Sequence, residues 1–224
     1  EVSANVGVVS NYFFRGVTQT DDGAAVQGGL DYGHESGFYA GTWASTVDFG
    51  SSLVDTDGDD VPDAIESSDT SYEVDLYLGY GGSFGDVGYD VGYIYYAYPD
   101  GDDLDFGELY GSLTYSYLTA GLAYTVNSQA DSGGFTEGDI YYYAGVDVPF
   151  GESGYTGSLY YGNYTFDDDG EADGEGGVYD LDYDHWTASI AKDAGDFGSF
   201  SMNLEKADLE DDDLKVWVGW SKSF

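Results

Sequence analysis

The residues with the clearest spacing for chemistry lie in the segment "DTDGDDVPDAIE", residues 55–66. Calcium loops place oxygen ligands at positions 1, 3, 5, 7, 9 and 12, with a backbone carbonyl at position 7 and a bidentate glutamate at position 12. Position 6 is Asp60 rather than the glycine of an EF-hand loop, and the flanking sequence predicts no helices. We therefore expect an isolated Asp-rich Ca²⁺ loop, and the alternative is an acidic loop that is only solvated. The expected ligands are Asp55, Asp57, Asp59, Val61, Asp63 and Glu66.

A second group of acids stands at alternate positions of one extended segment. Asp180, Asp182 and Asp184 occupy positions i, i+2 and i+4. Because strand side chains repeat every second residue, these three carboxylates would share one face. They would either attract cations or simply solvate a wide interior, and both interpretations stay open.

Arg15 is the only arginine in the chain. By alternation it faces inward at the end of the first expected strand. One interpretation is a positive charge that shapes a constriction among carboxylates. The other is a structural ion pair with a nearby inward acid such as Asp31.

The two histidines give little support for catalysis. His34 lies at a short turn, and no serine or carboxylate in the sequence pairs with His185 to form a nucleophile and base. No phosphate-binding or dinucleotide motif is present. We therefore expect no enzymatic activity.

The charge balance limits the partners of the chain. Of 224 residues, 44 are Asp or Glu and 5 are Lys or Arg, which gives a net charge of −39. Such a chain repels nucleic acid and attracts cations. It has no cysteine and no run of 18 apolar residues that would form a transmembrane helix. It begins at a strand-like pattern without Met, so we expect a chain from which a signal peptide has been removed.

The elements that must position these residues are strands. Apolar and polar residues alternate in runs of about ten residues, which is the period of a pleated strand. The expected strands are 2–15, 25–34, 38–49, 72–81, 87–98, 106–116, 118–127, 139–150, 155–166, 178–191, 197–206 and 213–224.

The connections between these runs alternate in length and charge. Every second connection is short, for example "GESG" at 151–154. The long, acidic ones are 16–24, 50–71, 99–105, 128–138, 167–177 and 207–212. Short turns at one end and long loops at the other are typical of outer-membrane β-barrels. We therefore expect one all-β domain over residues 1–224, a closed antiparallel up-and-down barrel of about twelve strands, with an acidic insertion at 50–71.

The phase of each strand predicts which side chains face inward. In the run 72–81, Leu76 and Leu78 share one face, and Glu73 and Asp75 share the other. In a membrane barrel the apolar face meets lipid and the polar face lines the lumen. The phase slips near His185, which predicts a β-bulge there. The expected lumen residues are Arg15, Asp31, Asp48, Glu73, Asp75, Asp90, Glu108, Asp147, Asp180, Asp182, Asp184, Glu205 and Lys215.

Several sequence blocks resemble a known family. They are "NYFFRGVTQT" (11–20), A-x-Q-G-G-x-D-Y (25–32) and "SGFYAGTWAS-x-VDF" (36–49). The segment 10–49 resembles the TorF-like family of proteobacterial porins. The resemblance implies an outer-membrane β-barrel with a transport function, and it implies no catalytic residues. The chain ends in "VWVGWSKSF", and the terminal Phe224 resembles the signal read by the barrel-assembly machinery.

The sequence therefore predicts an outer-membrane porin for passive diffusion of small solutes, with a preference for cations. The alternative is a non-conducting surface barrel whose acidic loops bind Ca²⁺ and contact partners or lipopolysaccharide. Besides these, the expected partners are outer-membrane lipid and small solutes or cations, and nucleic acid is excluded.

Overall fold

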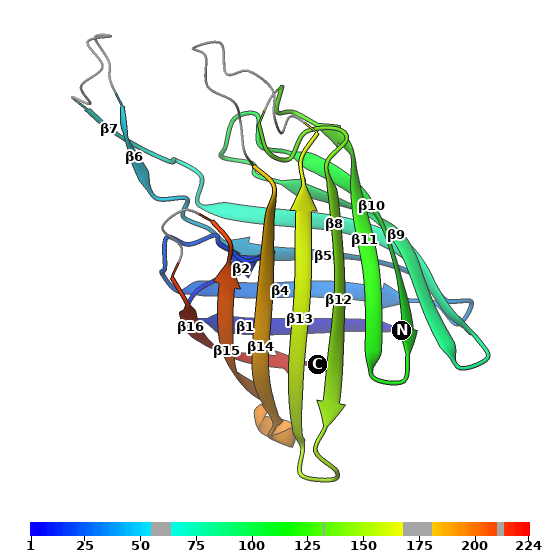
Figure 1. The fold of residues 1–224 in the computed structure, drawn as a ribbon. Helices are drawn as coiled ribbons and strands as arrows, with labels where there is room; N and C mark the ends of the chain where they lie inside the picture. The colour runs from blue at the N-terminus through cyan, green and yellow to red at the C-terminus, as the bar shows by residue number, and fades with distance from the viewer. Residues whose placement is uncertain (55–63, 132, 168–180, 210–212) are drawn as a thin grey trace.

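The computed structural model describes residues 1–54, 64–131, 133–167, 181–209 and 213–224, and gives only the backbone of residues 52–54 and 64–67. Within these residues the chain forms a closed antiparallel barrel of twelve strands (Figure 1). Each barrel strand pairs with the next, and β1 pairs with β16 to close the ring. The up-and-down barrel expected from the sequence is confirmed. No helix among the described residues is long and apolar enough to cross a membrane.

The barrel strands have the following bounds. They are β1 (Val2–Val9), β4 (Ala25–Gly33), β5 (Phe38–Thr46), β8 (Tyr72–Phe84), β9 (Val87–Ala97), β10 (Phe106–Tyr115), β11 (Leu118–Ser128), β12 (Ile140–Pro149), β13 (Tyr155–Thr165), β14 (Tyr183–Asp193), β15 (Ser199–Ala207) and β16 (Lys215–Ser223). Two small hairpins form separate two-stranded sheets that are not part of the ring, β2 (Phe13–Phe14) with β3 (Val17–Thr18), and β6 (Ser51–Val54) with β7 (Ala64–Ser67). A 3₁₀ turn, η1 (Gly195–Phe197), connects β14 to β15.

Strand β8 shows why the alternating sequence forms a wall of this kind. Its outward side chains Leu76 and Leu78 are 55% and 50% exposed, whereas Glu73 and Asp75, which precede them on the opposite face, are 2% and 6% exposed. A water-soluble sheet packs its apolar face inward. Here the apolar face points out and the carboxylates point in, so the pattern is inverted.

The barrel has two unlike ends. The connections 10–24, 47–71, 98–105, 129–139, 166–182 and 208–214 lie at one end, which we name the long-connection end. The β6–β7 hairpin projects from this end (Figure 1). The short turns and both chain termini lie at the other, the short-turn end, where Ala4 and Phe224 exchange backbone hydrogen bonds. In Figure 1, β1, β4 and β5 of the rear wall cross β12–β14 of the front wall at a steep angle, as expected for tilted barrel strands.

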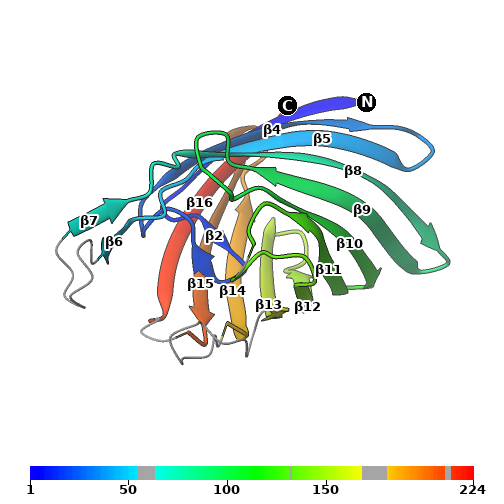
Figure 2. The ribbon, with the colours of Figure 1, turned by 90° about the horizontal axis from the view of Figure 1, so that it is seen from above.

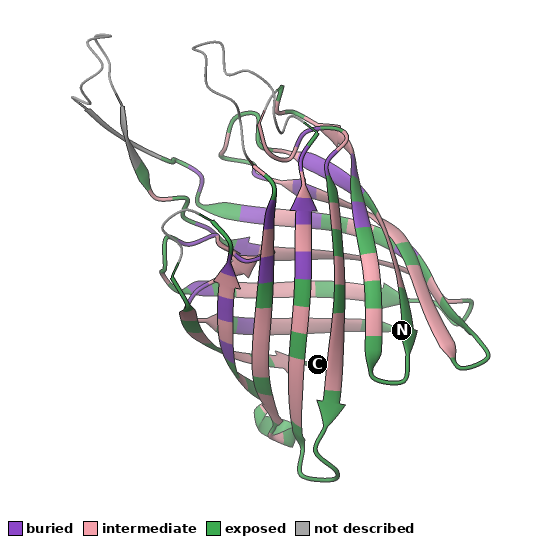
Figure 3. Ribbon diagram, in the orientation of Figure 1, coloured by how far each residue is buried: buried purple, intermediate pink, exposed green. Residues whose placement is uncertain are grey.

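The most buried residues gather toward the long-connection end (Figure 3). One aromatic cluster contains Tyr164 and Tyr183, and a second contains Tyr96 and Phe106. Phe135, from the connection 129–139, packs against both. The barrel is therefore filled by side chains at this end.

Two expectations from the sequence are wrong. The first strand ends at Val9 rather than residue 15, because the chain then turns into the barrel. No bulge interrupts β14 near His185, because its pairing with β13 is regular from Tyr183 to Lys192. A register shift lies instead between Gly107 and Glu108 of β10, where it pairs with β11. The insertion 50–71, whose fold the sequence left open, contains the paired strands β6 and β7, with Leu53 opposite Ile65.

Candidate functional site

Residues 10–24, which we name the plug segment, leave the barrel wall after β1 and fold inside the ring, where Figure 2 shows β2. Aromatic contacts place the segment against two strands of the wall that are separated in the ring by β4 and β1. The Tyr12 ring meets Trp43 of β5 at 5.6 Å between centroids, and the Phe13 ring stacks on Trp217 of β16 at 6.2 Å. Backbone polar groups inside a barrel need partners, and the segment supplies some of its own by forming the β2–β3 hairpin.

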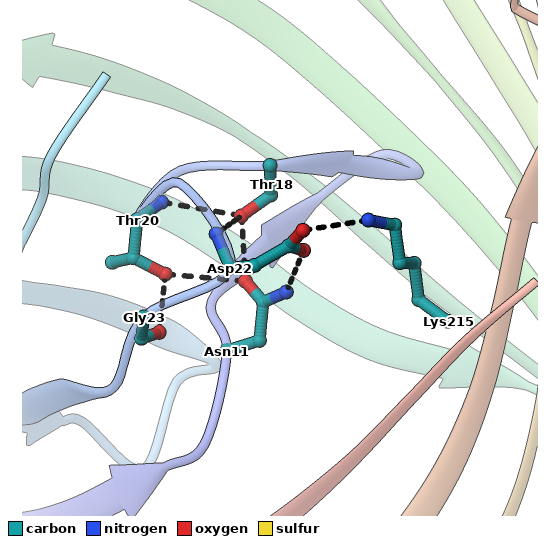
Figure 4. Close-up of polar contacts among 6 residues, drawn as sticks. All are labelled: Asn11, Thr18, Thr20, Asp22, Gly23 and Lys215. Carbon is teal, nitrogen blue, oxygen red and sulfur yellow. Dashed lines mark hydrogen bonds and ion pairs between the residues drawn. The ribbon is translucent and has the colours of Figure 1, made fainter. Parts of the chain in front are cut away.

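The base of the plug segment is held by a polar network (Figure 4). Asn11 donates to Asp22 through Nδ2 at 2.8 Å, and its Oδ1 accepts from the hydroxyls of Thr18 at 2.6 Å and Thr20 at 3.1 Å. Lys215 of β16 donates to the second oxygen of Asp22 at 2.6 Å. This hydrogen bond from Lys215 lowers the pKa of Asp22 below its usual value. The network closes the loop and ties it to the wall.

The turn of the hairpin requires glycine. Arg15 and Gly16 both have positive φ, at 49° and 90°. A Cβ on Gly16 would lie 2.6 Å from Cβ of His185 on β14. Since real Cβ atoms do not approach so closely, Gly16 lets the tip of the hairpin touch the wall.

Arg15 forms the central contact of the plug. Its two terminal nitrogens donate to the two carboxylate oxygens of Glu108 on β10, at 2.7 and 2.6 Å. The side chains are 9% and 1% exposed. The guanidinium carbon also lies 4.2 Å from the ring centroid of Tyr141, 4.6 Å from Phe14 and 4.9 Å from Tyr164. Such a planar bidentate pair, stacked on aromatic rings, is a geometry that lysine does not reproduce.

The connection 129–139 supplies the second part of the plug. Its Phe135 packs on Phe106 at 4.9 Å, on Tyr164 at 5.7 Å, and on Phe14 and Phe166 at 6.2 and 6.3 Å between ring centroids. Asp139 closes this connection by accepting hydrogen bonds from the backbone and hydroxyl of Thr136. Two connections far apart in sequence therefore meet at the same place inside the barrel.

A buried carboxylate pair lies beside the plug on β8. Glu73 accepts hydrogen bonds from the hydroxyls of Tyr12 at 3.0 Å and Tyr98 at 2.9 Å. Asp75 faces the same way, and its Oδ1 is buried with no hydrogen-bond partner among the described residues. Because a buried polar atom without a partner is unfavourable, Asp75 is a strained position of the wall.

A second acid is linked to the plug through His185. Nδ1 of His185 lies 3.3 Å from Oε1 of Glu205, and Nε2 lies 2.9 Å from the Tyr141 hydroxyl. A carboxylate only accepts hydrogen bonds, so Nδ1 is the donor to Glu205. The same glutamate oxygen accepts from the Thr187 hydroxyl at 2.8 Å.

Farther toward the short-turn end, each of three inward aspartates accepts a hydrogen bond from a tyrosine hydroxyl on another strand. The pairs are Tyr77–Asp31, Tyr39–Asp90 and Tyr160–Asp147. A tyrosine hydroxyl satisfies an oxygen of the carboxylate but leaves its charge in place. The interior of the barrel thus keeps negative charge below the plug.

Cavities lie on both sides of the plug. One of about 550 Å³ opens at the long-connection end and is lined mainly by apolar side chains. Two smaller cavities, of about 290 and 230 Å³, lie nearer the middle of the strands, and Arg15 lines both. Among the described residues, the plug therefore separates an apolar outer cavity from a more polar interior.

A family described as "Bacterial protein of unknown function (Gcw_chp)" matches residues 1–217. The chain belongs to the Gcw_chp family. No curated protein matches the sequence. Among solved structures the fold is similar to the KdgM porin, with a TM-score of 0.58 and 10% identity over 99% of each chain. It is also similar to the "KdgM porin in complex with disordered oligogalacturonate", with a TM-score of 0.53 and 10% identity over 100% of this chain and 98% of that one.

These likenesses establish the barrel fold of the Gcw_chp chain. They do not test its resemblance to the TorF-like porins, which stays a prediction.

The structure of this Gcw_chp barrel places most of the expected lumen residues on its inner side. Those with side chains directed inward on barrel strands are Asp31, Glu73, Asp75, Asp90, Glu108, Asp147 and Glu205. Arg15 reaches the interior from the plug segment rather than from a strand, and Lys215 lies near the plug base. The expected partner of Arg15 was Asp31. The observed partner is Glu108, because the chain has left the wall before Arg15.

Other expected lumen residues lie elsewhere. Asp184 is on the outward face of β14, beside Trp186, because Tyr183 and His185 take the inward phase of a strand without a bulge. Asp48 follows the end of β5, and Asp182 precedes β14, where it accepts a hydrogen bond from the backbone of Phe166 at 2.7 Å. Asp180 lies outside the described residues.

The expected calcium ligands are not covered by the structure. Asp55, Asp57, Asp59, Val61 and Asp63 lie outside the described residues, and only the backbone of Glu66 is described, on β7. Within the described part of the chain, no three His, Cys, Asp or Glu residues are grouped to hold a metal. Ca²⁺ binding therefore stays a prediction.

Sequence reasoning missed the plug. The signal was present, since Tyr12, Phe13 and Phe14 are consecutive aromatic residues and interrupt the strict alternation of the first strand. Gly16 directly after Arg15 was a further turn signal. No comparable feature of the sequence predicted that Phe135 would lie inside the barrel.

Proposed function

We propose that this barrel is an outer-membrane channel through which small solutes diffuse passively, with a preference for cations. The observation that carries the proposal is the inverted wall of β8, with Leu76 and Leu78 outside and Glu73 and Asp75 inside. Lipid requires an apolar exterior and a sheet without free edges, and the closed ring satisfies both. In this proposal the long-connection end faces the exterior of the cell and both termini face the periplasm.

The preference for cations follows from how the interior charges are paired. The guanidinium of Arg15 is neutralised by Glu108, and Lys215 is paired with Asp22 at the plug base. Asp90 and Asp147 receive only tyrosine and serine hydroxyls. Their uncompensated charge creates a potential that favours cations in a channel with low-dielectric walls.

The same charges argue against one ligand of a structural relative. The KdgM porin is described in complex with oligogalacturonate, which is a chain of carboxylated sugars. Such a polyanion would need unpaired basic groups along its path. Because Arg15 is paired with Glu108, we do not extend that ligand to this chain.

The proposal is tested by reconstitution into planar bilayers. We expect single-channel conductance, and in a KCl gradient a reversal potential of cation sign that shrinks as ionic strength rises. Asp90→Asn combined with Asp147→Asn should reduce this selectivity. The matched control is Asp184→Asn, which changes an aspartate on the outward face and should leave selectivity unchanged. A reversal potential of anion sign in the wild type would overturn the cation preference.

The second candidate function is a non-conducting surface barrel whose acidic connections bind Ca²⁺ and contact partners or lipopolysaccharide. The observation that favours it is the packing of Arg15, Phe135 and Tyr164 inside the barrel. Absence of conductance from folded protein would support this candidate against the channel. The absence of enzymatic activity stays a prediction in both cases.

The calcium part of this candidate has its own test. Neutralising Asp55, Asp57 and Glu66 together should abolish a calorimetric Ca²⁺-binding event, because these residues supply the first, third and bidentate last positions of the loop. Unchanged calcium stoichiometry in that triple variant would return the segment 55–66 to a solvated acidic loop.

A further inference from the structure

The outer cavity, of about 550 Å³, is built by all six long connections. Each connection contributes at least one lining side chain. Representative ones, in chain order, are Val17, Phe49, Leu104, Phe135, Leu181 and Leu209. Connections at the surface of a chain with a net charge of −39 are expected to be polar. Six connections that converge with apolar side chains on one cavity instead indicate a built site.

The cavity has the size and lining of a small-molecule site. Ligand pockets measure about 300–1,000 Å³ and combine apolar and aromatic walls with a few polar groups. Its floor is formed by aromatic side chains, among them Phe106 of β10 and Phe135 of the connection 129–139. At its rim Phe49, Leu104 and Leu209 are still 39%, 37% and 38% exposed. A ligand that covers these three side chains gains the free energy of burying their apolar surface.

The charged groups of the cavity have one sign. Asp21 and Asp48 line it together with the neutral Thr18 and Gln19, and none of the described residues that line it is basic. The two aspartates lie on the same side, because Gly50 donates its backbone N–H to Asp48 and also approaches the carboxyl group of Asp21. Aromatic walls beside carboxylates are the surroundings in which proteins bind organic cations.

We propose that this outer cavity, which we name the vestibule, is a binding site for organic cations with an aromatic or alicyclic body, that is, amphiphilic amines. The apolar body lies on the aromatic floor, and the ammonium group faces Asp21 and Asp48. The role of the site in uptake rests on the proposed channel function, since it would hold the solute directly above the Arg15 plug. Binding itself does not require that the barrel conducts.

The test uses three probes with one aromatic body and different charge: 1-naphthylmethylamine, 1-naphthylmethanol and 1-naphthylacetate. Binding to the purified full chain in lipid nanodiscs is measured by calorimetry, with empty nanodiscs as the blank. We expect the amine to bind about tenfold more tightly than the alcohol, because cation–π and carboxylate contacts together supply that difference. The acid should show no binding above the blank.

Two pairs of variants locate the site. Leu104→Gln should weaken the binding of the amine about fivefold, because less apolar surface is buried when the amine binds. The control is Leu214→Gln, which changes an exposed leucine at the same end of the barrel that does not line the cavity. The double variant Asp21→Asn with Asp48→Asn should bind the amine and the alcohol with the same affinity. Its control, Asp131→Asn, changes an exposed acid of another connection. Circular dichroism verifies that each variant keeps its strands.

The outcomes separate the inference from the channel. Equal binding of amine and alcohol to the wild type would overturn the cationic class of ligand. If Leu104→Gln leaves the affinity for the amine unchanged, the amine does not bind in the vestibule and the proposed location is wrong. If the barrel conducts but the amine does not bind, the vestibule inference fails and the channel stands. If the amine binds as expected and the barrel does not conduct, the channel fails and the vestibule site stands.

Discussion

Removing the carboxylate that faces Arg15 should release the plug. In Glu108→Gln the amide keeps the shape of the side chain but leaves the guanidinium without a counter-charge, at a position where the two side chains are 9% and 1% exposed. Breaking one partner of a buried ion pair costs about 3–5 kcal/mol. The barrel does not need to unfold to relieve this cost, because the plug segment is a connection and its departure returns Arg15 to water. The ratio of released to docked plug should therefore rise by about a hundredfold or more.

Two assays follow the release. Trypsin cleaves after arginine, and Arg15 is the only arginine of the chain, so cleavage of the bond between Arg15 and Gly16 reports directly on the plug. In the wild type we expect this bond to be protected, because the Arg15 side chain is only 9% exposed and Tyr183 donates a hydrogen bond to the Arg15 carbonyl at 3.0 Å. In Glu108→Gln we expect rapid cleavage, identified by mass spectrometry, and a larger single-channel conductance.

The controls distinguish charge from packing. Asp90→Asn removes an inward acid that accepts a hydrogen bond from Tyr39 and has no basic partner among the described residues, and it should leave the bond after Arg15 protected. The double variant Arg15→Met with Glu108→Met removes both charges, and replacing a buried pair by apolar residues is often neutral. It should therefore keep the conductance of the wild type unchanged. A folded Glu108→Gln variant with unchanged conductance and unchanged trypsin resistance would refute the role of the ion pair in holding the plug.

Three further predictions rest on other contacts. Asp75→Asn should raise the stability of the barrel to thermal unfolding by about 1 kcal/mol, because Oδ1 of Asp75 is buried without a hydrogen-bond partner among the described residues and an amide at this position can donate a hydrogen bond to the neighbouring Glu73; lower stability would mean that the carboxyl group of Asp75 already has its hydrogen bonds. Gly16→Ala should loosen the plug by about 1–3 kcal/mol, since φ is 90° and the new methyl would meet a side chain at 2.6 Å, and trypsin cleavage after the neighbouring arginine measures it. An epitope tag beside Asp103 should be labelled on intact cells and one within 151–154 should not, and the reverse pattern would contradict the proposed orientation.

The plug and the vestibule are parts of one arrangement. Phe135 contacts Phe14 on the plug and also lines the outer cavity. Val17 of β3 lines the same cavity from the other side. Release of the plug in Glu108→Gln should therefore also weaken amine binding, because it displaces Val17 and Asp21, which line the cavity from the plug segment. The two experiments share residues, but each has its own readout.

The wall of the barrel was predictable because it depends on a local rule. In a strand, neighbouring side chains point to opposite faces, so the order of Glu73, Asp75, Leu76 and Leu78 already separates interior from exterior. The same rule fails where its assumption of a continuous strand fails. It placed Asp184 inside the barrel by assuming a strand that began before residue 183 and contained a bulge, and the regular pairing of β13 with β14 places that side chain outside.

The sequence by itself determined the number of strands, their alternation and the two unlike ends, because each follows from residues close together in the chain. Only the tertiary structure decided that the chain leaves the wall after Val9 and that Arg15 meets Glu108, 93 residues away. That pairing requires the ring to close, since closure sets which strand lies opposite the plug. It also requires Gly16 to approach β14 closely, and Phe135 to enter from another connection. Contacts across a barrel interior depend on the diameter of the barrel and on which side chains enter it. The alternation of residues within a single strand predicts neither.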